Sequence, residues 1–129
     1  MLSSTTKYAI KALLALKDRD TDNFIQVSTL ARRSKVPGPY LAKIMKALTA
    51  HKIVSSRRGA NGGVRLASDF EQLTLLDICT ALGDPITSTN CVMGKTGCNT
   101  ANPCVLHNSW SASKKSILKF LQESKLANL

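Results

Sequence analysis

The stretch STLARRSKVPGPYLAKIMKALTA, residues 28–50, decides the fold that we expect for this chain. Apolar residues recur at helical spacing on both sides of a turn at residues 34–39, and the prolines of that turn cannot lie inside a continuous helix. Ser28 is a good N-cap for the first helix, and Pro39 is acceptable at the first position of the second. Two short helices joined by a tight turn are the helix-turn-helix pattern.

A β-hairpin is predicted directly after the second helix. Residues 53–58 and 64–67 form two short strands, and Asn61 followed by Gly62 is a strong hairpin signal between them. A basic hairpin that follows a helix-turn-helix is a wing, so its arginines are expected to contact phosphates or to enter a minor groove. These arginines are Arg57, Arg58 and Arg65.

Further helices are predicted on both sides of this unit. One covers residues 6–17, and another begins within residues 73–77, where Thr74 and Asp77 resemble a capping box. Gly83 and the proline two residues later stop that helix. The fold class is therefore mainly α, a winged helix-turn-helix with a small two-stranded wing.

A last helix is predicted from about Cys104 to about Lys125. It lies beyond a small complete domain, so its apolar stripe needs a partner. Either it folds back on its own domain, or it pairs with a second copy. A homodimer is favoured because winged-helix readers usually bind two half-sites with a two-fold protein. The expected dimer contacts are Trp110, Ile117 and Leu121.

Composition narrows the class of protein. The formal net charge of +10 over 129 residues indicates a polyanionic partner, and nucleic acid is favoured over an anionic membrane surface. The apolar content of 43% is sufficient for a packed core, yet no stretch is long and apolar enough to span a bilayer. Lysines interrupt the apolar run near the N-terminus, so we predict no signal peptide and a reducing cytoplasm. Cysteines there point to metal or redox chemistry rather than to disulfides.

Three thiols and one imidazole gather in a loop. Cys91, Cys98, Cys104 and His107 are spaced C-x6-C-x5-C-x2-H in a segment rich in Gly, Asn, Thr and Pro. Such donors can converge on one metal centre, and the long spacers favour an iron–sulfur cluster over the tight knuckles of structural zinc. If the last helix has begun at Cys104, the side chain of His107 shares a face with it. Zinc, a thiol–disulfide switch and idle cysteines remain the alternatives.

The remaining reactive residues receive structural assignments. Cys79 lies on the apolar face of its helix and is expected to be a core residue. His51 falls at a helix C-terminus, which favours histidine. No Ser/His/Asp or Cys/His constellation and no phosphate-binding glycine loop is present, so the chain is not expected to be an enzyme. A small iron–sulfur electron carrier is the rival class, which the basic helix-turn-helix and wing disfavour.

These motifs together resemble the IscR/NsrR-type (Rrf-family) bacterial transcription regulators. The resemblance covers nearly the whole chain. It rests on YAIKAL at residues 8–13, YLAKI at 40–44, RRGANGG at 57–63 and the loop with three cysteines. The wing combined with the cysteine loop is a specific pair of features.

The resemblance implies a dimeric winged helix-turn-helix regulator, mostly repressing, whose grip on a double-stranded DNA operator responds to a 2Fe–2S or 4Fe–4S cluster. Members sense cluster supply, iron, nitric oxide or redox state. The implied cluster ligands are Cys91, Cys98 and Cys104, with His107 as the fourth. Tyr40 and its neighbours would read the major groove, and Arg58 would enter the minor groove. The full set of expected DNA contacts is Ser28, Pro39, Tyr40, Lys43, Arg57, Arg58, Asn61 and Arg65.

Two departures from the family pattern concern the cluster. The first spacer has six residues where the family often has five. Some members take a ligand from an acidic residue on helix one of the partner, and here Lys7 lies in that neighbourhood.

We expect a DNA-binding domain at residues 1–83, a cysteine loop at 84–104, and a dimerisation helix with its tail at 105–129.

Overall fold

The computed structural model describes residues 1–19, 21–95 and 97–129. Five α-helices are described: α1 (Ser4–Lys17), α2 (Val27–Ser34), α3 (Gly38–Ala50), α4 (Leu75–Ala81) and α5 (His107–Glu123). The strands β1 (Val54–Arg57) and β2 (Gly63–Leu66) pair antiparallel, and short 3-10 turns occur at η1 (Phe70–Gln72), η2 (Pro85–Thr87) and η3 (Leu126–Asn128). The mainly α winged helix-turn-helix is thereby confirmed.

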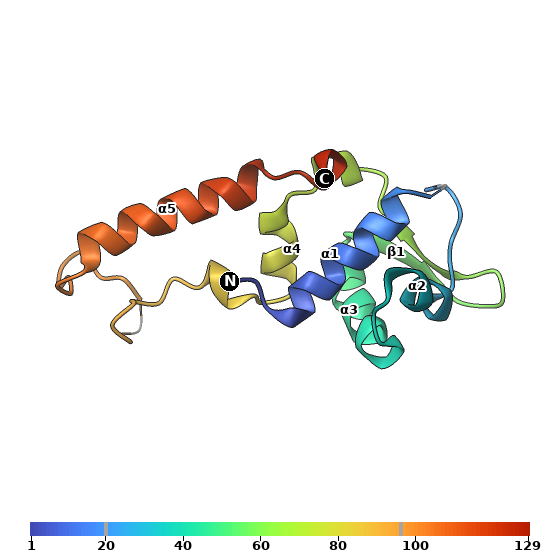
Figure 1. Ribbon diagram of the computed structural model, residues 1–129, viewed down its shortest axis with the longest axis horizontal. Helices are drawn as coiled ribbons and strands as arrows, with labels where there is room; N and C mark the ends of the chain where they lie inside the picture. Colours follow the sequence, from blue (N-terminus) through green and yellow to red (C-terminus); the bar gives the residue numbers. More distant parts are fainter. Residues whose placement is uncertain (20, 96) are drawn as a thin grey trace.

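The core lies where α1 crosses the helix-turn-helix and α4 (Figure 1). Leu13 of α1, Leu30 of α2, Leu41 and Leu48 of α3, and Ile78 of α4 are all fully buried. Each lies on the apolar stripe of its helix, so helical periodicity and burial agree. The apolar face of α3 therefore packs against α1 and α4, and its other face is left to solvent.

The wing has a third strand-like partner that the sequence analysis did not assign. Ile25 forms an isolated antiparallel bridge with Val64 of β2, with N–H to carbonyl oxygen distances of 2.9 and 2.8 Å. Asn61 and Gly62 do lie in the hairpin connection, but the left-handed backbone falls at Gly59 (φ 105°) and Gly63 (φ 130°). The hairpin was predicted correctly, and Gly62 of the Asn-Gly step does require glycine, because a Cβ atom there would lie 2.1 Å from the Arg57 carbonyl oxygen.

Two helix starts differ from the prediction. α2 begins at Val27 with Gln26 at the N-cap, so Ser28 lies inside the helix and its predicted capping role is wrong. The bridge at Ile25 places the N-cap two residues earlier than the capping preference of Ser28 would. α5 begins at His107, and Cys104 precedes it in a turn closed by the His107 N–H and the Cys104 carbonyl (3.0 Å). The premise that these two side chains share a helix face is therefore wrong.

The other predicted capping features hold. Thr74 and Asp77 form the predicted capping box at the start of α4, with Thr74 N–H donating to the Asp77 carboxylate at 2.9 Å. Cys79 is fully buried as expected. His51 caps the end of α3, with its Nδ1 atom 3.0 Å from the Ala47 carbonyl oxygen.

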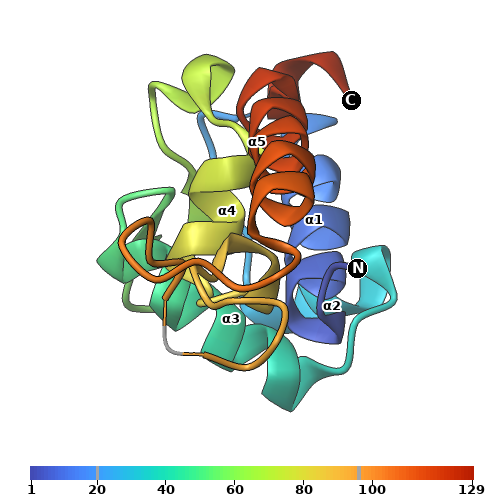
Figure 2. The ribbon, with the colours of Figure 1, turned by 90° about the vertical axis from the view of Figure 1, so that its left-hand side faces the viewer.

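The loop after η2 carries the chain away from the rest of the fold, and α5 then brings it back (Figure 1). Figure 2, which looks nearly along α5, shows it over α4 and α1 with the cysteine loop at its near end. Leu121 and Leu126 are fully buried in the core of their own chain, and the Leu126 N–H donates to the Leu73 carbonyl at 2.9 Å. The prediction that Leu121 contacts a partner is therefore wrong, since no part of that side chain is left to contact one.

Candidate functional site

The exposed face of the helix-turn-helix and the wing enclose a groove of about 660 Å³. Gln26 and Ser28 come from α2 and its N-cap, Lys46 comes from α3, and Arg57 and Arg58 come from the wing. The surface is basic and open to solvent. It matches the electrostatic and shape requirements of duplex DNA, in which a helix enters the major groove and cations meet phosphates.

The predicted reading residues lie together along the first turns of α3. Pro39, Tyr40 and Lys43 are all exposed, and the Tyr40 side chain keeps 56% of its surface in solvent. Its ring meets the ring of Tyr8 from α1 edge-on at a centroid separation of 6.0 Å. That contact fixes the direction of Tyr40 and leaves its exposed part free to contact bases.

The three wing arginines differ in their surroundings. Arg65 donates to the Asp22 carbonyl oxygen at 2.7 Å and lies over the Phe24 ring, and Arg57 lies over the same ring. Within the part of the chain that the structure describes, the Arg58 side chain has no hydrogen bond, ion pair or ring contact. Arg58 is therefore the wing arginine whose guanidinium is uncommitted.

The cysteine loop brings two of its three thiols together. The Sγ atoms of Cys91 and Cys104 are 3.4 Å apart, and the Met93 N–H donates to Cys91 Sγ at 3.4 Å. Gly94 (φ 85°) and Gly97 (φ 77°) supply the left-handed backbone that turns the loop around Cys91. Cys98 is exposed, and its backbone N–H donates to the Thr89 carbonyl oxygen at 3.2 Å. No three His, Cys, Asp or Glu side chains among residues 1–19, 21–95 and 97–129 are close enough to bind a metal ion together.

The pKa values of the Cys91 and Cys79 thiols are shifted in opposite directions. The Met93 N–H and then the Cys104 thiol, both hydrogen-bonded to Cys91 Sγ, lower the pKa of Cys91, with Lys95 adding to the effect. Burial raises the pKa of Cys79 to about 11, and the nearby Asp84 carboxylate contributes to the increase. The thiolate is both the nucleophile and the metal ligand. The lowered pKa of Cys91 therefore favours reaction and metal binding, and the raised pKa of Cys79 disfavours both.

The cysteine loop is anchored at its start by Asp84, which sequence analysis did not single out. This carboxylate is 2% exposed and accepts hydrogen bonds from the Ser3 N–H and the Ile86 N–H, each at 2.9 Å. Burial tends to raise the pKa of Asp84, but these bonds and those from the Thr6 and Ser3 hydroxyls outweigh it and hold that pKa below its ordinary value. Asp84 thereby ties the loop to the first turn of α1.

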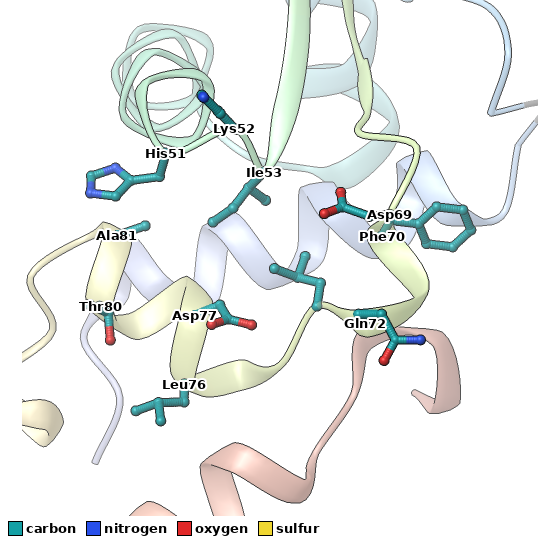
Figure 3. A pocket seen from close by; sticks show the side chains of 11 residues that line it. His51, Lys52, Ile53, Asp69, Phe70, Gln72, Leu76, Asp77, Thr80 and Ala81 are labelled. Carbon is teal, nitrogen blue, oxygen red and sulfur yellow. The ribbon is translucent and has the colours of Figure 1, made fainter.

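A second pocket, of about 450 Å³, lies where α4 meets the end of α3. Figure 3 shows His51, at the end of α3, above Ala81 and Thr80 of α4, with Phe70 of η1 on the far side. The pocket marks the contact between the DNA-reading unit and the helix that leads into the cysteine loop. No helix in the described ranges is long and apolar enough to cross a membrane.

A surface helix that presents one face to DNA beside a basic wing defines a winged helix-turn-helix DNA-binding protein. The Rrf2 family, described as "Iron-dependent Transcriptional regulator", matches residues 2–129, so the chain belongs to the Rrf2 family of transcription regulators. Its members are regulators and not enzymes, in agreement with the sequence-based expectation.

Individual relatives along the whole chain are also named as transcription regulators. A protein of Aquifex aeolicus (strain VF5), named as an HTH-type transcriptional regulator, is 31% identical over 100% of this chain and 90% of its own length. The HTH-type transcriptional regulator IscR of Yersinia pseudotuberculosis (serotype O:1b) is 29% identical over 99% of this chain and 77% of its own length.

Solved structures show the same fold. The structure of T. potens IscR is 25% identical, with a TM-score of 0.76 over 98% of this chain and 83% of that one. CymR of B. subtilis, the global cysteine regulator, has a TM-score of 0.78 at 20% identity, covering 98% of this chain and 92% of that chain. At that identity the second likeness speaks for the fold alone.

Proposed function

We propose that this transcription regulator binds a two-half-site operator as a homodimer, and that an iron–sulfur cluster in the cysteine loop controls its affinity. The units are those expected above: a DNA-binding domain at 1–83, the cysteine loop at 84–104 and the dimerisation helix at 105–129. The observation that carries the proposal is the approach of two loop thiols to 3.4 Å, beside a basic reading surface.

The donor set fits a cluster. Cys91 and Cys104 lie together, and an N–H group already points at Cys91 Sγ, as hydrogen bonds to cluster sulfurs do. Cys98 and His107 would complete the set, with the glycines of the loop allowing Cys98 to approach. The family description as iron-dependent and the IscR relatives support iron over zinc. When bound, such a cluster supplies one-electron redox chemistry and a centre that oxygen or nitric oxide attacks.

The chain's own residues link the loop to the reading surface. Asp84 fixes one end of the loop to α1, and His107 begins α5 at the other end. Ordering the loop would change how α5 is held against the winged domain, and hence the spacing of two recognition helices. A coupling of roughly 1–3 kcal/mol changes operator occupancy about tenfold or more.

The dimer is proposed to form along α5. Trp110 and Ile117 remain the predicted contacts, both half-buried in the single chain, and the neighbouring Phe120 is 60% exposed. Leu106, 45% exposed, extends the same apolar surface beyond the start of the helix. A partner that covers these side chains would remove apolar area from water.

Arg58→Ala is expected to weaken operator binding about tenfold while leaving any cluster intact, because one minor-groove arginine contributes roughly 1–3 kcal/mol. A titration of labelled operator duplex measures the affinity, and the visible spectrum reports the cluster. Lys115→Ala is the control, since it removes one positive charge from an exposed position on α5, which lies across the fold from the wing (Figure 1). If both variants bind as the unchanged protein does, the wing assignment is wrong.

Cys98→Ala is expected to abolish cluster binding but not dimerisation, since it removes a proposed thiolate ligand and leaves the apolar side chains of α5 unchanged. Protein purified without air would be analysed for iron, acid-labile sulfide and zinc, and its mass in solution measured. Cys79→Ser is the control, because that thiol is buried in the core. A fully coloured Cys98→Ala protein would remove Cys98 from the ligand set.

A thiol switch is the second candidate, and the same 3.4 Å approach favours it. A Staphylococcus aureus member of this fold was solved in an "oxidized form". With a peroxide as the oxidant, the Cys91 and Cys104 thiols would lose two protons and two electrons to form one Sγ–Sγ bond, and the peroxide would be reduced to water. Colourless protein, free of iron and sulfide, that gives a peptide linking Cys91 to Cys104 after peroxide treatment would favour the switch over the cluster.

A further inference from the structure

The wing is attached to the helix-turn-helix by the three residues that precede α2. Ile25 bridges to Val64, so the backbone of this segment runs as a short third strand beside β2. The side chains on either side of Ile25 point to the wing instead of to the core. Phe24 and Gln26 therefore have contacts that a linker between two helices does not need.

Phe24 holds two arginines of the wing. The guanidinium carbon of Arg65 lies 4.4 Å from the centre of the Phe24 ring, and that of Arg57 lies 5.4 Å from it. Two like charges beside one ring would separate if only the backbone held them, and the electron-rich face of the ring attracts both. Arg65 is fixed further by its bond to the Asp22 carbonyl oxygen (2.7 Å).

Gln26 holds the tip of the wing. Its Nε2 donates to the carbonyl oxygens of Gly59 and Ala60, at 3.3 and 3.0 Å. These residues directly follow Arg58, so the amide fixes the backbone from which the uncommitted arginine projects. The wing is thus restrained along its strands by Phe24 and at its tip by Gln26.

We infer that Phe24 and Gln26 are positioning residues, which set the angle of the wing so that Arg58 reaches the minor groove beside the recognition helix. The inference rests on the proposed DNA contact of Arg58. It also assigns Arg57 and Arg65 mainly to holding the wing, with phosphate contact secondary.

The test uses the full chain and a labelled duplex selected from a random pool by the unchanged protein. Phe24→Leu is expected to weaken binding about tenfold, and Phe24→Trp, which keeps an aromatic face, to stay within about threefold. Gln26→Glu cannot donate to the wing carbonyls and is expected to weaken binding about tenfold. Gln72→Glu, which adds the same charge on an exposed residue far from the wing, is the matched control.

A double-mutant cycle separates positioning from general loss of structure. In an Arg58→Ala background, Phe24→Leu and Gln26→Glu should cause little further loss, because they act through Arg58. Hydroxyl-radical footprints should lose protection of the sugars in the flanking minor grooves, and dimethyl sulfate footprints should keep protection of guanine N7 in the major groove. Equal losses in both backgrounds, or uniform fading of the footprint, would overturn the inference. If Arg58→Ala itself binds normally, the proposed wing contact fails; if only the Phe24 and Gln26 variants bind normally, this inference alone fails.

Discussion

Gly63→Ala is expected to destabilise the fold by more than about 4 kcal/mol, the range of backbone clashes that cannot relax. A Cβ atom at Gly63 would lie 1.9 Å from the Ile25 carbonyl oxygen and 2.7 Å from the Gln26 nitrogen. Both atoms belong to backbone, so no side chain can move aside. The φ of +130° adds strain for any residue with a Cβ.

The Gly63→Ala clash acts at one contact, and it is expected to lower the stability of the whole domain. Relief of the clash requires Ile25 to leave β2, which breaks both hydrogen bonds of its bridge to Val64. Since a domain of this size is stable by only about 5–15 kcal/mol, the loss removes a large part of the total. Urea unfolding followed by circular dichroism measures it.

Gly59→Ala is the matched control for Gly63→Ala. Gly59 also has a positive φ, of 105°, but nothing lies within 4 Å of its ideal Cβ position. Its alanine variant should show only the conformational cost of about 1–2 kcal/mol. If Gly63→Ala were no more destabilising than Gly59→Ala, the close approach of the 24–26 segment to the wing would be wrong.

Asp84→Asn is expected to reduce the free energy of unfolding by about 2–4 kcal/mol at neutral pH. The amide of asparagine offers one acceptor oxygen where the carboxylate offers two, and its NH₂ group would face donors. The Ser3 and Ile86 N–H groups and the Thr6 hydroxyl now converge on that carboxylate. At least one of these buried donors would lose its partner.

The pH dependence follows from the direction of the shift. The pKa of Asp84 is lower in the folded chain than its ordinary value, so the unfolded chain takes up a proton first as the pH falls. The stabilisation is complete above the ordinary aspartate value of about 3.9 and is lost as the pH drops through the folded pKa. The difference between the unchanged protein and Asp84→Asn should therefore be constant from about pH 5 to 8 and shrink below about pH 4.

Asp69→Asn supplies the comparison for Asp84→Asn. Asp69 is exposed, so the same change of charge should alter the urea midpoint little. An Asp84→Asn protein as stable as the unchanged one at pH 7 would refute the anchoring role. Since Asp84 fixes the start of the cysteine loop, a stable Asp84→Asn dimer would also show whether that anchor affects operator binding.

Rules that use only neighbouring residues predicted the elements that neighbouring residues determine. The turn prolines separate α2 from α3, and the pairing of Thr74 with Asp77 starts α4 where expected. Cys79 is buried because its position on an apolar helix face decides burial. The wing was predicted from its turn residues, and Gly62 of that turn is a position where a Cβ atom would clash with the Arg57 carbonyl oxygen.

The errors share one physical cause, which is contact between residues far apart in the chain. Ser28 lost its capping role because Ile25 bridges to β2. Leu121 was assigned to a partner because periodicity cannot tell which apolar surface a helix will cover, and the chain returns through Leu126 to the core. No local pattern indicated that Asp84 would meet the start of α1.

The sequence by itself determined the class of this protein: a basic helix-turn-helix, a wing and a cysteine loop, each readable from short spacings and charge. Only the tertiary structure decided which thiols approach, which wing arginine is uncommitted and what holds the wing in place. These depend on distances between residues that are separated by tens of positions in the chain. Hydrophobic periodicity and capping preferences carry no information about such distances.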